Sequence, residues 1–526
     1  MGWIFLGCRV ADSPALAKDL GRLLFHDQVY VIVRAIFFLP ISIVIFFVEW
    51  SRGTREAPLL KVSREAKAEH AKRVEKVAQS VKSQAGEGAQ LFTSRPDRER
   101  ISSRILAPRK QKIDTSELKN LVEVDTEKGF AVVEPRLRMV ELSHFLLSSE
   151  AQIYPRERPW SRQGYSVPCV PELDDLTVGG LLMGCGIEST SWKYGMFNEI
   201  CQCYEIVTCT GEVQSVTEES DKELFHTLPW SHGTHGILVS ATLRIIPAKP
   251  FVRLQLTHCE DRDSLCKTLE SSVGTGDHEF VEGLAFNPSF AVVMTGSYVD
   301  APDASDEILS LGKWHDPWFF KQVQEKKEGE VCWSTTEYLH RHSKSIFWEL
   351  AYLQPWGNTM FFRYLLGWIN PLNIALVKSY QPEWTMRYYC NVNVIQDYLI
   401  PLTELKPMLD LGDDSLGVYP IWLCPYLNKH HEVRSIHHPH SDKDEMYIDV
   451  GYYGLPSVVN FDMKSALRRI EDWLLPRKGF VMLYALHTLG EKDLRRMFSF
   501  EAYDRVRSRM GSASIFPTID EKVRVG

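Results

Sequence analysis

The sequence predicts an α+β protein with one membrane-spanning helix near its N-terminus, and three observations lead to this prediction. Residues 113–248 alternate short β-type runs with short helical segments, residues 29–50 form one long apolar stretch, and residues 179–186 contain four glycines. A chain of 526 residues can bury the cores of two domains. The expected divisions are 1–50, 51–112, 113–248 and 249–526.

The stretch Val29–Trp50 is the predicted membrane anchor. It has 22 residues, with Arg34, Ser42 and Glu49 as polar positions, and about 20 apolar residues suffice to cross a bilayer. A signal peptide is the first alternative, but the stretch is too long and no small-residue cleavage site follows it. A helix buried in the protein core is the second. A single-pass anchor is therefore favoured.

The net charge of −8 is distributed unevenly along the chain. Residues 51–112 carry an excess of nine positive charges, residues 1–50 sum to zero, and the remainder carries −17. Basic residues after an apolar span predict that the C-terminal bulk lies in the cytosol. An acidic body argues against nucleic-acid binding.

The basic segment is expected to contain a helix at Leu59–Ser83. Val74, Val77 and Val81 recur with helical periodicity, and Glu69 can pair with Arg73. Such a helix lies against the acidic body, along an anionic bilayer surface or in solvent.

Short elements are expected along the main body in chain order. The β-type runs at 121–125 and 130–135 flank a turn that ends in Gly129, which indicates a hairpin. A helix is expected at 139–147, and strands at 204–208 and 446–453. The eleven cysteines are scattered, so they indicate small apolar residues rather than a disulfide framework.

The glycine-rich segment Pro171–Ser189 is the most informative part of the chain. Its glycines follow the pattern G-G-x-x-x-G-x-G, which differs from both the Rossmann fingerprint and the P-loop. Glycine lets backbone N–H groups approach an anion closely. The pattern therefore predicts a cradle for a pyrophosphate, with a structural turn as the alternative.

This segment and the strings that follow it resemble the FAD-binding domain of the vanillyl-alcohol oxidase and p-cresol methylhydroxylase superfamily. The strings are PELDDLTVGG at 171–180, SWKYG at 191–195 and GTHGILV at 233–239. The first of them, with the Trp-containing strings at 345–350 and 419–425, is similar to the 24-dehydrocholesterol reductase branch. The resemblance runs from about residue 20 onward. It implies a p-cresol methylhydroxylase-type FAD-binding domain at 113–248, which starts within 51–112, and a substrate-capping domain at 249–526.

The resemblance also implies which residues hold the flavin: the glycine-rich loop, the string after it and the later G-x-x-G turn. The expected cofactor-binding residues are Thr177, Val178, Gly179, Gly180, Leu181, Leu182, Met183, Gly184, Cys185, Gly186, Ile187, Glu188, Ser189, Lys193, Tyr194, Gly195, Gly233, Gly236 and Ile237.

The activity implied by the resemblance is the FAD-dependent, NADPH-driven reduction of the Δ24 double bond in a sterol side chain, of the desmosterol-to-cholesterol type. Because this double bond is not conjugated to a carbonyl, a proton must be supplied as well as a hydride. The candidate donors are Tyr484, Glu445 and Asp449, although such residues are more often part of a core or solvated. The expected location is the endoplasmic reticulum membrane, with the Golgi membrane as the alternative, and sterol-pathway enzymes or a second copy are the expected protein partners.

Two departures from the family pattern keep other functions open. An insertion occupies 150–163, and Trp192 stands where animal members have histidine. The alternatives are a FAD-dependent oxidase of a small alcohol or sugar acid, and a catalytically weakened regulatory homologue. The histidine-rich stretch at 430–440 is interpreted as a solvated loop, so no metal is predicted. The string Leu365–Ile369 either lines a sterol cleft, belongs to the core or dips into the membrane.

Overall fold

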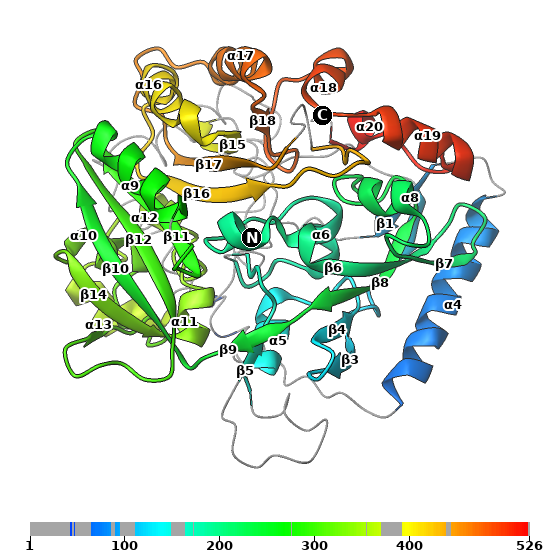
Figure 1. Ribbon diagram of the computed structural model, residues 1–526, viewed down its shortest axis with the longest axis horizontal. Helices are drawn as coiled ribbons and strands as arrows, with labels where there is room; N and C mark the ends of the chain where they lie inside the picture. Colours follow the sequence, from blue (N-terminus) through cyan, green and yellow to red (C-terminus); the bar gives the residue numbers. More distant parts are fainter. Residues whose placement is uncertain are drawn as a thin grey trace, which may run out of the picture.

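Two β-sheets organise the fold, as the computed structural model in Figure 1 shows. The structure describes residues 43–44, 47, 65–85, 90–94, 111–148, 164–171, 173–274, 276–353, 355–369, 392–437 and 443–523. The predicted membrane span lies outside these residues except for Ile43, Val44 and Phe47, and the insertion at 150–163 lies outside them entirely. Within the described residues, no helix is long and apolar enough to cross a membrane.

The smaller sheet has five antiparallel strands in the order β3-β4-β8-β6-β7. The predicted hairpin is confirmed as β3–β4, and Gly129 takes a left-handed φ of +71° in its turn. Two further strand pairs lie beside this sheet, β1 with β2 and β5 with β9. The strand bounds are β1 Leu91–Ser94, β2 Gln111–Asp114, β3 Leu121–Asp125, β4 Phe130–Val133, β5 Gly164–Ser166, β6 Cys201–Val207, β7 Val213–Val216, β8 Ile237–Arg244 and β9 Ile246–Ala248.

Five α-helices accompany the smaller sheet in the described residues up to 248. The predicted helix at 139–147 is confirmed as α5, whose N-terminus is closed by Glu141: its carboxylate accepts the backbone N–H of Arg138 at 3.0 Å and the Arg138 guanidinium at 2.9 Å. Between the glycine-rich loop and β6, the chain forms only short helical turns. The bounds are α4 Ala66–Ala85, α5 Met139–Leu147, α6 Val178–Met183, α7 Ser191–Tyr194 and α8 Lys222–Thr227, with a 3-10 turn at Phe197–Ile200.

Helix α4 packs on the protein body, which was one of the three positions expected for it. It buries Val74, Val77 and Val81 against β2, β3 and β6. The imidazole of His70 lies between two carboxylates of the sheet, 2.7 Å from Glu134 and 3.0 Å from Glu205. Burial alone would lower the pKa of His70, but these carboxylates raise it to about 9. The charge cluster therefore fixes the basic helix to the acidic body.

The larger sheet has nine strands in the order β13-β14-β10-β12-β11-β16-β17-β15-β18. All neighbouring pairs are antiparallel except β13 and β14. The predicted strand at 446–453 is confirmed as β17. The bounds are β10 Phe251–Cys259, β11 Phe280–Asn287, β12 Phe290–Val299, β13 Glu307–Ile308, β14 Gly329–Ser334, β15 Val394–Pro401, β16 Ile421–Asn428, β17 Glu445–Gly454 and β18 Phe480–Val481.

Helices cover one face of the larger sheet. Leu269 of α9 reaches Gly283, and Gly412 of α16 contacts Tyr452; Figure 1 shows α16 and α17 above β15–β17. The opposite face, here the inner face, carries Glu282, Asp397, Trp422, Asp449 and Tyr453, as the strand register requires. The bounds of the helices are α9 Arg262–Gly274, α10 Phe319–Glu325, α11 Thr335–Leu339, α12 Glu349–Leu353, α13 Met360–Leu366, α16 Leu405–Ser415 and α17 Met463–Leu474.

The last part of the chain returns to the smaller sheet. Helix α19 packs on α8, and the buried guanidinium of Arg507 donates a 2.6 Å hydrogen bond to the carbonyl of Thr234. The C-terminal helices are α18 Glu491–Met497, α19 Glu501–Met510 and α20 Ile519–Val523; 3-10 turns lie at Gly367–Ile369, Leu402–Glu404, Leu475–Arg477 and Ser512–Ser514.

Candidate active site

The four glycines of the predicted pyrophosphate loop differ in their surroundings. A Cβ at Gly179 would lie 2.5 Å from Pro135, and a Cβ at Gly186 would lie within 3 Å of three side chains, so close packing within the protein accounts for both. The amide of Gly179 donates to the carbonyl of Pro135, and that of Gly184 donates to the carbonyl of Gly180. Gly180 is exposed and Gly184 is half-buried. A Cβ at Gly184 would lie 2.7 Å from the carbonyl of Gly180, so Gly180, within α6, is the open position among the four.

The G-x-x-G turn lies against the end of this loop, as the sequence predicts for two parts of one site. The amide of His232 donates a 2.8 Å hydrogen bond to the carbonyl of Met183. Trp230 and His232 both adopt left-handed backbone angles, with φ of 62° and 52°. Non-glycine residues take this conformation at an energetic cost, and such residues cluster at ligand sites.

The string after the loop points its polar side chains toward the larger sheet. Lys193 forms a 2.7 Å ion pair with Glu279, and the Tyr194 hydroxyl donates to the same carboxylate at 2.9 Å. Trp192, one of the two departures noted in the sequence, donates its indole N–H to the backbone carbonyl of Glu279. The predicted cofactor residues Lys193 and Tyr194 are thus joined to the residue just before β11, and Gly195 bends the chain with a φ of +83°.

A buried ion cluster connects the loop to the inner face. Arg341, only 2% exposed, donates to Glu188 at 2.5 Å and to both oxygens of Glu282 at 2.8 Å. Burial favours the protonated form of Glu282, but the Arg341 guanidinium holds the pKa of that carboxyl well below its usual range; burial raises the pKa of Glu188. The Arg341 guanidinium therefore joins the glycine-rich segment Pro171–Ser189 to the larger sheet. The sequence predicted Glu188 as a site residue but did not indicate Arg341 and Glu282, the other two members of the cluster.

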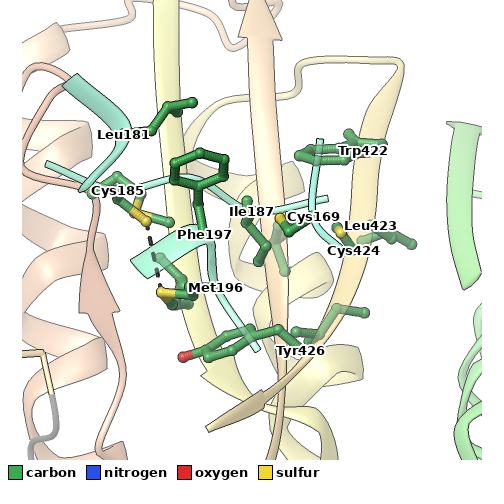
Figure 2. Packing of buried hydrophobic residues seen from close by; sticks show 14 of the residues in the cluster. Cys169, Leu181, Cys185, Ile187, Met196, Phe197, Trp422, Leu423, Cys424 and Tyr426 are labelled. Atoms are coloured by element: carbon green, nitrogen blue, oxygen red, sulfur yellow. Dashed lines mark hydrogen bonds between the residues drawn. The ribbon is translucent and has the colours of Figure 1, made fainter. Parts of the chain in front are cut away.

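The loop and the inner face are in direct contact around this cluster. Figure 2 shows Cys169 and Ile187 packed against Trp422 and Cys424 of β16. The indole N–H of Trp422 donates to Glu282 at 2.9 Å, which continues the ion cluster along the sheet.

The candidate donor Tyr484 belongs to a second polar cluster on the inner face. Its hydroxyl donates to Asp397 of β15, and the hydroxyl of Tyr453 donates to the other oxygen of the same carboxylate. Asp397 is 1% exposed, and burial raises its pKa to about 6, although the hydrogen bonds from the two phenols act to lower it. Tyr484 is half-buried, whereas Tyr453 is buried between Phe347 and Trp348. Tyr484 is therefore the more accessible phenol.

The other two candidate donors both lie on β17. Asp449 is fully buried on the inner face, where it pairs with Leu399 of β15 and Cys424 of β16. Asp397 pairs with Gly451, two positions further along β17. Glu445 is half-buried at the start of the strand. Asp449 therefore shares the inner face with Asp397, the hydrogen-bond partner of Tyr484. Glu445 lies at the end of the strand. Sequence reasoning missed Asp397, which is one of many aspartates and lies 87 residues from Tyr484.

The residues at this contact fit a large polar cofactor. Among the buried polar atoms without a hydrogen-bond partner in the part of the chain that the structure describes, Glu188 Oε2, Thr190 Oγ1 and the Tyr426 hydroxyl lie at this contact. Buried polar atoms of this kind are normally paired, so they require a ligand or water. Together with exposed Gly180, they offer hydrogen-bonding groups beside an open backbone. FAD has the phosphates, ribityl hydroxyls and ring heteroatoms to complement such groups.

Comparison with known proteins agrees with this arrangement. Residues 108–217 match the model of an FAD binding domain. The chain is 36% identical to human Delta(24)-sterol reductase over 96% of its own length and 95% of the relative's, and 34% identical to the Arabidopsis thaliana protein of the same name over 79% and 76%. It is 23% identical to bovine L-gulonolactone oxidase over 77% and 83%.

These findings define a flavoprotein whose FAD-binding domain is of the p-cresol methylhydroxylase type and packs under a large β-sheet. At 36% identity over nearly the whole length of both chains, the protein belongs to the Delta(24)-sterol reductase family.

Proposed function

We propose that this protein is an FAD-dependent oxidoreductase that reduces the Δ24 double bond of sterol side chains with electrons from NADPH. The observation that carries the proposal is the 36% identity to Delta(24)-sterol reductases, which extends over the flavin segment and the large sheet alike. Similarity to L-gulonolactone oxidase is lower, at 23%, so it supports the shared flavin fold rather than a sugar-acid oxidase.

The reaction divides between cofactor and protein. Bound FAD, when reduced, supplies a hydride. The chain must bind the sterol tail, exclude water and provide a proton. Asp397 and Tyr484 suit the last task, because a buried carboxyl whose pKa is raised to about 6 still holds a proton up to about that pH and contacts a phenol that is half-buried. In this assignment Tyr484 donates to the alkene carbon and Asp397 returns a proton to Tyr484.

The loop residues 177–189, with Lys193, Tyr194, Gly195 and the turn at 233–237, are proposed to hold the flavin. Residues 113–248, joined by the basic segment 51–112, form the flavin domain, and residues 249–526 cover the sterol. Residues 29–50 anchor the chain in the endoplasmic reticulum membrane with its bulk in the cytosol. The basic excess after the apolar span supports this orientation.

The decisive experiment is desmosterol conversion by membranes that express the chain, with and without NADPH. We expect conversion that requires NADPH and is absent from membranes without the chain. An L-gulonolactone-dependent uptake of oxygen without sterol conversion would instead identify an oxidase. Protein that purifies without flavin would favour the regulatory homologue.

The topology is tested separately by protease treatment of sealed microsomes. Digestion of the C-terminal bulk is expected, and full protection of that bulk would overturn the proposed orientation.

A further inference from the structure

Exposed apolar side chains gather at one corner of the larger-sheet half. Met360, Phe361, Tyr364 and Leu365 of α13 are 71%, 74%, 52% and 55% exposed, and Trp314 beside them is 45% exposed. We call these five residues the apolar corner. They are half of the ten exposed large hydrophobic residues in the described part of the chain. Such clustering marks an interaction site, since single exposed apolar residues are ordinary.

Helix α13 is built to present these side chains outward. Thr359 caps its N-terminus by accepting the amide of Phe362, and Phe362 itself is buried. The exposed positions 360, 361, 364 and 365 repeat with the helical period, so they form one continuous face. Trp314 joins that face because its backbone packs on Gly367 and the neighbouring His315 ring stacks on Tyr364, with 5.1 Å between centroids.

Three cations border the apolar corner. Lys313, Lys344 and Arg363 form no ion pair within 4 Å among the residues that the structure describes; Arg363 and Lys344 donate to backbone carbonyls instead. Asp316 and Glu337 are the nearby acids: Asp316 is buried and accepts from Ser310 and the Lys313 amide, and burial lowers the pKa of Lys344 to about 8 against the attraction of both carboxylates. The rim therefore carries three basic side chains against two acidic ones. Exposed Trp, Phe and Leu beside this excess of Lys and Arg match the interface of an anionic bilayer.

The segment of chain that leads to the apolar corner also contacts the inner face. The chain runs from Trp348, whose indole N–H donates to the carbonyl of Tyr453, through α12 to α13. Tyr453 in turn donates to Asp397. In Figure 1, α13 lies at the lower left of the molecule, near β14.

We propose that the apolar corner inserts into the interface of an anionic membrane and forms a second membrane contact, through which the sterol passes from the bilayer to the inner face. The role in sterol transfer rests on the proposed function, whereas the membrane contact does not.

The contact is tested on the full-length chain in phosphatidylcholine–phosphatidylserine vesicles with a bilayer-dissolved diazirine photolabel. We expect label on the peptide containing residues 360–365 and none on the peptide containing Val459, an equally apolar residue that is 84% exposed elsewhere. Phe361→Asp with Leu365→Asp should reduce the label by at least ~10-fold, because two large side chains no longer favour the bilayer. Equal labelling of both peptides in the native chain would overturn the contact, as would an unlabelled corner that instead mediates dimerisation.

Sterol transfer is tested by kinetics with two modes of delivery. In the same double variant, KM for desmosterol in vesicles should rise by about 5-fold or more while KM for desmosterol in cyclodextrin stays unchanged. Flavin content should be normal, and Val459→Asp should have no effect on either value. Equal changes in both values would refute the transfer role. Absence of any sterol reduction in the native chain would refute the proposed function but leave the photolabelling result valid.

Discussion

The sharpest consequence of the structure concerns the phenol of Tyr484. In Tyr484→Phe the ring is kept, but the hydroxyl that contacts Asp397 is removed. If Tyr484 donates the proton, sterol reduction should fall by about 10²- to 10⁴-fold, the usual contribution of a positioned acid. Flavin content and the rate of flavin reduction by NADPH should be unchanged, because neither step needs this proton.

Tyr453→Phe is the matched control. It removes the other phenol from the same carboxylate, so it should cost a comparable ~1.5–3 kcal/mol of hydrogen bonding to a charged group. Because Tyr453 is 6% exposed, we expect it to position Asp397 rather than reach the substrate. Its turnover should fall only several-fold. Equal losses in the two variants, or normal turnover of Tyr484→Phe, would refute a donor role for Tyr484.

The same cluster sets the pH dependence of the sterol half-reaction. Burial raises the pKa of Asp397 to about 6, so the carboxyl keeps its proton below that pH and can return it to Tyr484. Above about 6 the carboxylate forms and retains the phenol proton through its hydrogen bond. Single-turnover rates should therefore fall as pH rises through about 6, and Asp397→Asn should abolish this step. A step that persists in the asparagine variant would assign the titration to another group.

Three further predictions concern the rest of the structure. Arg341→Met leaves two carboxylates buried without their cation and should lower the free energy of unfolding by about 3–5 kcal/mol in denaturant titration, whereas Arg505→Met, at an exposed pair, should cost under ~1 kcal/mol. The pKa of His70 is raised to about 9 from 6.5, so its contribution to stability, about 3 kcal/mol, should be complete below pH 6.5 and lost as pH rises through about 9. A thermal melt of His70→Gln with the same high-pH loss as the native chain would contradict this. The Gly180→Val protein should purify folded but without flavin. The control Gly274→Val, where a Cβ meets open space, should keep its flavin and stay yellow. Full flavin content in Gly180→Val would show that the phosphates lie elsewhere.

Local pattern was sufficient to predict several elements of this fold. The hairpin at β3–β4, helix α5 and strand β17 lie where periodicity and turn residues put them, because each is determined by neighbours within a few residues. The apolar stripe of α4 predicted the buried face but not its partner. That partner depends on Glu134 and Glu205, which are 64 and 135 residues away from His70.

The candidate site was predictable only in part, for the same reason. A glycine-rich segment is easy to recognise in a sequence, yet close packing accounts for Gly179, Gly184 and Gly186. Only the structure shows that Gly180 is the exposed position of the four. Asp397 carried no local signal. It becomes a candidate because strand register places it on the inner face beside two phenols.

The ion cluster of Arg341 joins the glycine-rich segment to the larger sheet. Glu188 lies near the end of the glycine-rich segment and Glu282 lies on the sheet that carries Asp397, so one guanidinium fixes the position of the proposed cofactor loop relative to the proposed proton source. A reaction that adds a hydride and a proton to adjacent carbons requires such a fixed relation, since small displacements of a reacting group slow catalysis strongly. Lysine at position 341 would keep the charge but could not donate to both carboxylates with the same planar geometry. For Arg341→Lys, flavin binding should persist while sterol reduction slows, and coupled loss of both in flavin titration and turnover assays would show that the cluster serves folding alone.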